Sequence, residues 1–191
     1  MPSPPAFRFN AGHLSLDFVT TLRHRPSKRL DLLSAPADLG RWIAAAGLWD
    51  EAPAVSAADF ARAIALREAI NDVTRARLTQ APIPPASVDT VNACAAEPEA
   101  ALHLDADGWR ATRVSPNPVR SALTRIARDA IDLLTGPEQR LLKICDQPDC
   151  RMLFVDASPG ARRRWCSMER CGNRAKVAAF RTRLTAEPQE G

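Results

Sequence analysis

Hydrophobic side chains recur at helical spacing along much of the N-terminal part of the chain. In residues 37–48, four apolar residues fall near one face, as the buried stripe of an amphipathic helix does: Leu39, Trp42, Ile43 and Leu48. A longer helix is predicted after Ser56, because a serine followed three residues later by Asp59 is typical of a helix start. The predicted core positions of this longer helix are Phe60, Ile64, Leu66, Ile70 and Val73.

Prolines and polar caps mark where further helices begin and end. A pair of prolines at positions 84 and 85 precedes a helix that includes Val88, Val91 and Cys94, and Cys94 is predicted to be a buried small apolar residue. Asn117 caps another helix, which runs to Leu134, where the sequence Thr-Gly-Pro ends it.

Two stretches have the pattern of strands instead. Residues 7–22 alternate and are rich in β-branched and aromatic side chains, which predicts a strand. Residues 101–114 are typical of a hairpin, with the turn at Asp107-Gly108. Together with the helices, these patterns predict a mainly helical α+β fold with short β-hairpins.

Composition limits the class of protein. With 191 residues, of which 46% are hydrophobic, the chain can bury one good core and a small satellite module. It has no apolar run near the roughly 20 residues that cross a bilayer. Residues 1–5, Met-Pro-Ser-Pro-Pro, do not resemble the start of a secretion signal. We therefore expect a cytoplasmic protein without a membrane partner.

Four cysteines form two pairs of identical C-x4-C spacing, Cys145 with Cys150 and Cys166 with Cys171. Two tight turns can together present the four thiolates of one tetrahedral zinc site. Four protein ligands leave no position for an activated water, so this single zinc ion would be structural. Two disulfides or four unrelated thiols are the alternatives. Disulfides need an oxidising compartment, and the odd fifth cysteine, Cys94, fits a reducing one better.

The residues around these cysteines predict a small module of hairpin and helix. Residues 151–155 and 162–166 are predicted as two short strands joined by a turn at 156–161. The chain is predicted to be helical from Gly172 onward, which places Cys171 at a helix N-terminus, where the helix dipole favours a thiolate. A hairpin followed by a helix is similar to the treble-clef arrangement.

These patterns divide the chain into a helical domain at 1–136, a zinc module at 137–184 and a tail at 185–191. Because nearly all the large apolar residues lie in the first part, we expect a fragment that ends near Thr135 to fold alone. The alternative is that the start of the module docks onto the helices through three apolar residues, Leu141, Leu142 and Ile144.

Motifs in the module resemble a known family. The sequences Cys145-Asp-Gln-Pro-Asp-Cys150, Phe154-Val-Asp-Ala-Ser and Arg163-Arg-Trp-Cys-Ser-Met, with Cys171-Gly-Asn-Arg, closely resemble the CGNR zinc finger over residues 143–184. The stretch from Gly12 to Leu22 resembles the start of the ABATE domain, which accompanies this finger in bacterial proteins described as stress-induced transcription regulators. The resemblance implies a DNA-binding regulator whose N-terminal domain senses a small ligand or forms a homodimer. It also implies structural or ligand-facing roles for Asp17 and Phe18.

Positive charge is concentrated on the module. Residues 140–184 contain eleven Lys and Arg and four Asp and Glu, a net charge of +7, whereas the whole chain carries +4. Four thiolates around Zn²⁺ have a formal charge of −2, which some of these arginines can neutralise. A positive surface is left, as expected of a module that meets the phosphates of duplex DNA. The candidate nucleic-acid contacts are Arg162, Arg163, Arg164, Arg174, Lys176, Arg181 and Arg183.

Three residues of the module have both a structural and a functional interpretation. Asn173 can bond local backbone at the helix start or read a base, and we favour the first. Trp165 is predicted in the module's small core, with stacking on a base as the alternative. Arg174 can pair with Asp156 or contact phosphate.

The last helix leaves a second function open. Val177, Phe180 and Leu184 share one stripe, and a face of small residues with basic edges lies beside it. Such a face can approach a DNA groove or a neighbouring helix. The alternative function is therefore a zinc-stabilised module that binds a protein or a ligand and contacts no nucleic acid.

His13 and Asp17 are four residues apart, with His24 nearby, so an acid–base pair is conceivable. The sequence has no nucleophile motif, phosphate loop or second metal cluster to support catalysis. We therefore predict that the protein is not an enzyme.

Overall fold

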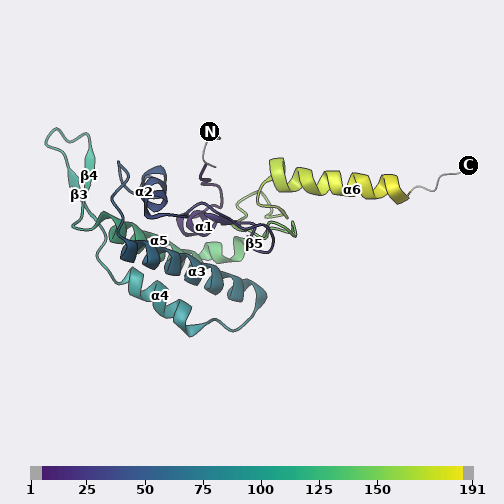
Figure 1. The fold of residues 1–191 in the computed structure, drawn as a ribbon, viewed down its shortest axis with the longest axis horizontal. Coiled ribbons are helices and arrows are strands. Elements are labelled where there is room, and N and C mark those ends of the chain that lie inside the picture. Colours follow the sequence, from purple (N-terminus) through teal and green to yellow (C-terminus); the bar gives the residue numbers. More distant parts are fainter. Residues whose placement is uncertain (1–5, 187–191) are drawn as a thin grey trace, which may run out of the picture.

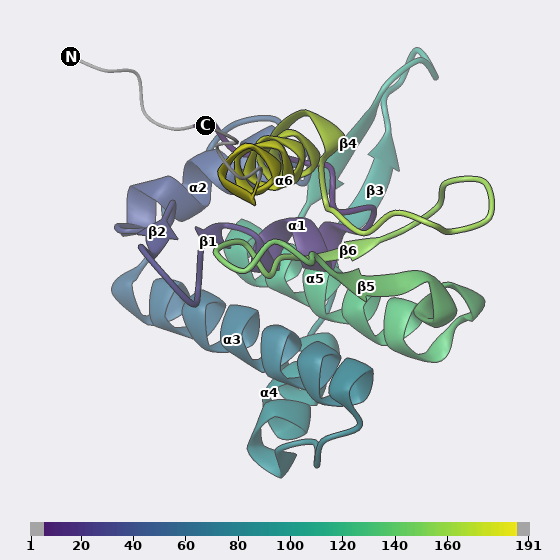
Figure 2. The ribbon, with the colours of Figure 1, turned by 90° about the vertical axis from the view of Figure 1, so that its right-hand side faces the viewer.

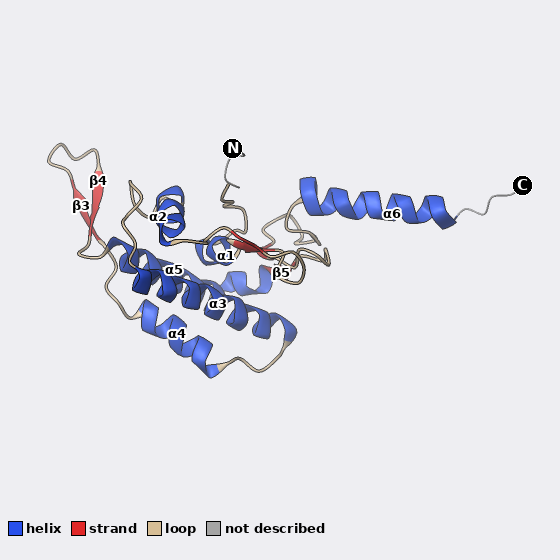
Figure 3. Ribbon diagram, in the orientation of Figure 1, coloured by secondary structure: helices blue, strands red, loops and turns tan. Residues whose placement is uncertain are grey.

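The computed structural model describes residues 6–186, and the side chains of residues 6–181. The fold is mainly helical (Figure 3). The helices are α1 (Leu14–Val19), α2 (Pro36–Ala45), α3 (Ala57–Thr79), α4 (Pro85–Ala95), α5 (Pro118–Thr135) and α6 (Asn173–Ala186). The strands form three antiparallel pairs, β1 (Leu22–Arg23) with β2 (Leu30–Asp31), β3 (Ala101–Leu104) with β4 (Ala111–Val114), and β5 (Leu142–Ile144) with β6 (Leu153–Val155).

Helices α3 and α5 form the centre of the helical body, since α1, α2 and α4 all contact both of them. Helices α3 and α5 lie side by side, with α4 packed against them on one side and α1 on the other (Figure 2). The β3–β4 hairpin projects from one end of the molecule, and α6 projects from the opposite end (Figure 1). The zinc module therefore lies at the end of the helical body away from the hairpin.

The helices predicted from hydrophobic spacing and capping residues are confirmed. The Ser56 Oγ accepts a hydrogen bond from the Asp59 N–H at 3.0 Å, and the Asn117 Oδ1 accepts one from the Arg120 N–H at 3.0 Å. The β3–β4 hairpin also lies within the predicted segment 101–114. Cys94 is only 3% exposed in the helical core, as predicted.

The predicted strand at residues 7–22 is wrong, because Leu14–Val19 forms helix α1. Consecutive residues of α1 are buried, so its apolar positions do not mark a single face. A tertiary contact secures the start of this helix, since the Ser15 N–H donates to the Asp129 carboxylate of α5 at 2.8 Å. The partner lies 114 residues away, so local sequence carries no sign of it.

Strand β6 contributes to two hydrophobic clusters. Leu153 and Val155 belong to the large core of the helices, whereas Phe154 packs with the four module cysteines. Successive side chains of a strand point to opposite faces, which explains this division. Leu142 of β5 also joins the helical core, while Leu141 and Ile144 pack against it. The start of the module thus docks onto the helices.

The N-terminal segment reinforces this connection. The Val155 N–H donates to the Ala11 carbonyl at 2.7 Å, next to Gly12. A Cβ atom at position 12 would lie 3.0 Å from the Val155 Cβ, and the φ of Gly12 is +95°. Only glycine allows the chain to pass so close to β6 in this conformation.

The predicted strand pairing within the module is wrong in one strand. Residues 151–155 include β6, but residues 162–166 are not a strand, and β6 pairs with β5 instead. The segment after β6 is bound by the side chains of Lys143 and Asp156 and does not form a ladder. The module is still a hairpin followed by a helix, as the α+β prediction requires.

No helix within residues 6–186 combines the length and apolar character needed to cross a membrane.

We predict that neighbouring residues of β6 stabilise different parts of the protein. Leu153→Ala should lower the unfolding free energy of the helical core by about 2–5 kcal/mol while the zinc content is retained. Phe154→Ala should instead weaken zinc retention, because Phe154 is fully buried against the cysteines. Denaturant unfolding followed by circular dichroism, together with zinc analysis, measures both effects. Equal effects of the two variants on both quantities would contradict the division.

Candidate metal centre

The four cysteines of the two C-x4-C pairs meet in one buried cluster. Their sulfur atoms all lie within 4.8 Å of one another, and Cys166 Sγ lies 3.7 Å from both Cys150 Sγ and Cys171 Sγ. A tetrahedron with Zn–S bonds of about 2.3 Å has S···S edges of about 3.8 Å. Each cysteine is at most 8% exposed. The cluster therefore fits one zinc ion in a closed structural site.

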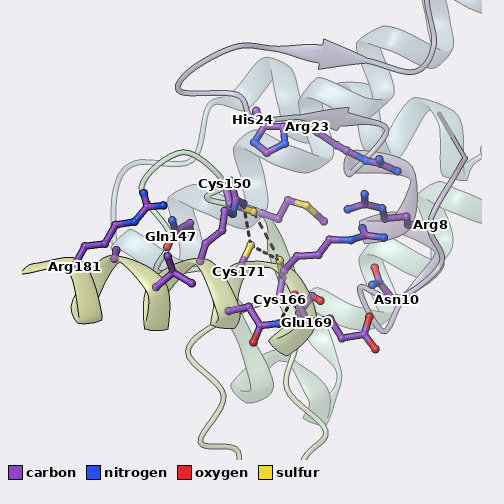
Figure 4. Close-up of a pocket in the computed structure, with 17 residues that line it drawn as sticks. Arg8, Asn10, Arg23, His24, Gln147, Cys150, Cys166, Glu169, Cys171 and Arg181 are labelled. Carbon is purple, nitrogen blue, oxygen red and sulfur yellow. Dashed lines mark hydrogen bonds between the residues drawn. The ribbon is translucent and has the colours of Figure 1, made fainter. Parts of the chain in front are cut away.

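The two pairs come from two different loops. Cys145 and Cys150 lie in the connection between β5 and β6, where the Cys145 N–H donates to the Met152 carbonyl at 2.8 Å. Cys166 and Cys171 lie after β6, and Cys171 falls in a π-helical turn, Met168–Gly172, that leads into α6. Figure 4 shows sulfurs from both pairs close together beside α6.

Disulfides do not form in this cluster. All five cysteines are free, and the 3.7 Å sulfur separations are far longer than the roughly 2.05 Å of an S–S bond. The alternative of unrelated thiols is also wrong, because the four sulfurs are gathered at one point.

The thiols influence one another's ionisation. Hydrogen bonding from Cys150 lowers the pKa of Cys145 to about 2. The same contact raises the pKa of Cys150 to about 12, and contacts with Cys145 and Cys150 raise the pKa of Cys166 further. Once one thiol has lost its proton, its negative charge therefore opposes ionisation of the next thiol. A bound divalent cation offsets the repulsion between thiolates, since a coordinated thiol is deprotonated outright.

Two residues of the Cys-Gly-Asn-Arg sequence, Asn173 and Arg174, make local contacts around the metal centre. Arg174 donates to the Cys171 sulfur at 3.4 Å, so it does not pair with Asp156. Asn173 donates its side-chain amide to the Glu169 carbonyl at 2.9 Å, which is a bond to local backbone but not the favoured helix cap, in which the side chain accepts an N–H. Trp165 packs against the cysteine cluster, as predicted for the module's core.

A buried ion pair organises the loop between β6 and Cys166. The Asp156 carboxylate is fully buried and accepts from Lys143 Nζ at 2.8 Å, from the Ser158 hydroxyl at 2.6 Å and from the Arg163 N–H at 2.7 Å. Burial alone would raise the pKa of Asp156, but these hydrogen bonds outweigh it and hold that pKa well below its usual range. Sequence reasoning missed Lys143 as a structural residue, because its role depends on the loop folding over it.

Besides Arg174, two more of the basic residues predicted to contact nucleic acid are engaged within the module. Arg163 donates to the Cys166 carbonyl at 2.7 Å, and its guanidinium lies 5.2 Å from the centre of the Phe154 ring. Arg164 donates to Asp146 at 2.7 Å, and its guanidinium lies over the ring of Trp165. Both side chains help to hold the loop around the metal ligands.

The predicted contacts still to be placed are Arg162, Lys176, Arg181 and Arg183. Arg162 and Lys176 are exposed, and neither side chain makes a hydrogen bond or ion pair within the described part of the chain. Arg181 is exposed on α6 (Figure 4). The side chains of Arg183 and Leu184 lie outside the described residues.

The conceivable acid–base pair of His13 and Asp17 is not assembled. His13 lies 3.3 Å from Asp129 and 3.0 Å from Glu138, whereas the Asp17 carboxylate accepts from the Ala11 N–H at 2.9 Å. Burial raises the pKa of Asp17 to about 6. The two side chains therefore have separate structural partners.

The structure brings the N-terminal segment beside the metal centre. Arg8, Asn10, Arg23 and His24 line the same cavity as three of the cysteines (Figure 4). Sequence reasoning missed this group, because no local motif links residues that are more than 120 positions from the metal ligands.

Two family models match the chain. The model of the ABATE family, described as "Putative stress-induced transcription regulator", matches residues 12–137. The model of the CGNR zinc finger matches residues 141–184. No curated protein matches the chain. Both predicted resemblances are confirmed, in the predicted order along the chain.

We predict that the chain binds about one zinc ion and that Cys166→Ser abolishes retention of this ion, because a closed site loses a quarter of its ligands. Zinc binding should weaken as the pH falls, since protons compete for the thiolates. Elemental analysis and competition with a chelator measure both effects. Cys94→Ser is the matched control and should keep its zinc, because Cys94 lies in the helical core. Full zinc retention by Cys166→Ser would contradict the assignment.

Proposed function

The chain belongs to the ABATE family, and we propose that it is a zinc-containing transcription regulator whose C-terminal module binds double-stranded DNA. In this proposal the N-terminal domain, which we place at residues 1–136, senses a small ligand or forms a homodimer. The module corresponds to residues 137–184. The observation that carries the proposal is a helix with basic residues, α6, that projects from the zinc centre (Figure 1).

The dimensions and surface of α6 suit a DNA groove. Its 14 residues span about 21 Å at 1.5 Å per residue. The major groove of B-DNA, about 12 Å wide, admits such a helix. Ala178 and Ala179 are exposed on α6 and let its backbone come near another surface, while Lys176 and Arg181 supply positive charge.

The zinc centre supports this use of the helix. Cys171 lies in the turn that leads into α6, so the metal would fix the start of the helix relative to the rest of the module. A rigid start allows the exposed basic side chains to meet phosphates in a fixed register. The net charge of +7 between residues 140 and 184 provides the long-range attraction.

The structure changes which arginines are suited to a test of DNA binding. Arg163 and Arg164 are engaged in the loop, so their removal would disturb the module itself. Arg162 and Lys176 are exposed and make no side-chain contact of that kind within residues 6–181. They are the better probes of phosphate contact.

One observation favours a second candidate function. Val177 and Phe180 of α6 are 48% and 62% exposed, and exposed apolar side chains on a projecting helix are typical of a protein-binding surface. In this alternative the zinc module binds a protein and no nucleic acid. Neither candidate is an enzyme, and both matching families are of a regulator or zinc-finger kind.

We predict that Arg162→Gln with Lys176→Gln weakens binding to all duplex sequences alike. Each lost phosphate contact should lower the magnitude of the slope of log affinity against log salt by about 0.9, so the slope of the double variant should be smaller by about two units. Fluorescence anisotropy over a range of salt concentrations measures the slope. Zinc analysis shows whether the module is intact.

Arg110→Gln with Arg113→Gln is the matched control. It removes the same charge from exposed positions at the β3–β4 hairpin, at the other end of the molecule (Figure 1). DNA binding by this control should be nearly unchanged. If the parent protein binds no duplex at low salt, or if both double variants behave alike, the DNA-binding proposal fails and the protein-binding candidate replaces it.

A further inference from the structure

A cavity of about 660 Å³ lies between the N-terminal segment and the zinc module. Its lining comes from two parts of the chain that are far apart in sequence (Figure 4). The first part supplies Arg8, Asn10, Arg23 and His24, and the second supplies residues of the metal loops and of α6, including Arg170, Arg174, Val177 and Arg181. The metal centre forms only a portion of this wall.

Arg23 is a buried cation that has no carboxylate partner among the described residues. It is 5% exposed, and its only side-chain hydrogen bond within the described chain is from Nη2 to the Ala6 carbonyl at 2.9 Å. Its Nε is buried and donates to no described atom. Burial lowers the pKa of Arg23, with no carboxylate to oppose the effect. An unpaired buried charge is costly, so this position calls for an anion.

Arg67 is also deeply buried, but carboxylates neutralise its charge. Arg67 is 2% exposed and donates to both carboxylate oxygens of Asp31, at 2.7 and 2.8 Å, and to Glu68 at 2.9 Å. The protein thus neutralises a buried guanidinium with its own carboxylates in one place and leaves the guanidinium that faces the cavity without them.

The rest of the lining is also cationic. Five arginines line the cavity, and Glu169 is the only carboxylate residue among the described lining. Arg174 is already directed to the Cys171 sulfur, but Arg8 is half-buried and makes no side-chain hydrogen bond within the described residues. The positive charge exceeds the formal −2 of a zinc ion with four thiolates.

We propose that this cavity binds a small organic anion, a carboxylate or a phosphate ester, with Arg8 and Arg23 as its charged contacts. Guanidinium groups bind both kinds of anion through paired hydrogen bonds. The volume lies within the range of small-molecule pockets, and Met152 and Val177 give the lining an apolar part for the rest of the ligand. Duplex DNA does not fit the role, because its rigid backbone cannot reach a side chain that is 5% exposed.

The position of the cavity beside α6 would couple ligand binding to the proposed DNA binding. A molecule held by Arg8 and Arg23 would also touch the first turns of α6, because Arg174 and Val177 line the same cavity. Ligand binding would therefore bias the position of the helix that we propose to contact DNA. This regulatory consequence rests on the proposed function, whereas anion binding itself does not.

Thermal unfolding of the zinc-loaded full chain tests the proposal, with inorganic phosphate, benzoate and phenyl phosphate as probes at constant ionic strength. At about ten times its dissociation constant, a bound probe should raise the unfolding midpoint by roughly 3–5 °C. The benzoate and phosphate arms distinguish a carboxylate site from a phosphate site. No midpoint shift with any of the three probes would overturn the proposal.

Arg23→Gln and Arg8→Gln should each abolish the shift, and Arg110→Gln on the β3–β4 hairpin is the control that should retain it. Arg8→Gln is included because the half-buried side chain of Arg8 can be changed with little risk to folding. Equal shifts in all four proteins would mean a general salt effect and would overturn the proposal. If Arg8→Gln and Arg23→Gln weaken duplex binding as strongly as Arg162→Gln, the cavity belongs to the DNA surface and the proposal also fails. A parent that binds the probes but no duplex would refute only the proposed function.

Discussion

The alternation of side chains along β6 holds the two parts of the molecule together. Leu153 and Val155 are buried in the helical core, and Phe154, between them, is buried against the cysteines. Three consecutive residues thus belong to two separate clusters, which the pleat of a strand makes possible. Because Val155 also bonds Ala11 and β6 pairs with β5, the zinc module cannot shift without disturbing the helices.

This attachment determines what surrounds the metal. The close passage of Gly12 along β6 brings the N-terminal segment over the module, and with it Arg8 and Arg23. The arginines of the chain consequently serve different purposes. Some neutralise carboxylates, as Arg67 does, and some bind the backbone of the metal loop, as Arg163 does. We propose that others bind ligands, the exposed Arg162 a phosphate of DNA and the cavity-lining Arg23 a small anion.

Much of the fold follows from local sequence, and the exceptions have physical causes. The capping residues of α3 and α5 and the apolar stripe of α5 predict these helices, because helix formation there depends on neighbours in sequence. The zinc site is predictable for a similar reason, since few structures other than a metal centre need two close pairs of cysteines. Helix α1 is not predictable in this way, because Asp129 secures its start from a distant helix. The β5–β6 pairing is not predictable from local sequence either. Leu142 and Ile144 of β5 are apolar, and this pattern predicts only that they dock onto the helices. Arg8 and Arg23 carry no local signal that they line a cavity beside the metal centre.

We infer that zinc folds the C-terminal module, while Leu153 and Val155 of β6 hold this module to the helical core. Amide hydrogen exchange before and after removal of zinc by a chelator tests it most directly, because exchange reports local opening residue by residue. We expect loss of protection between Cys145 and Gly172, a smaller loss at Val155, and continued protection in α3 and α5. Unchanged protection between Cys145 and Gly172 after complete zinc removal would contradict it.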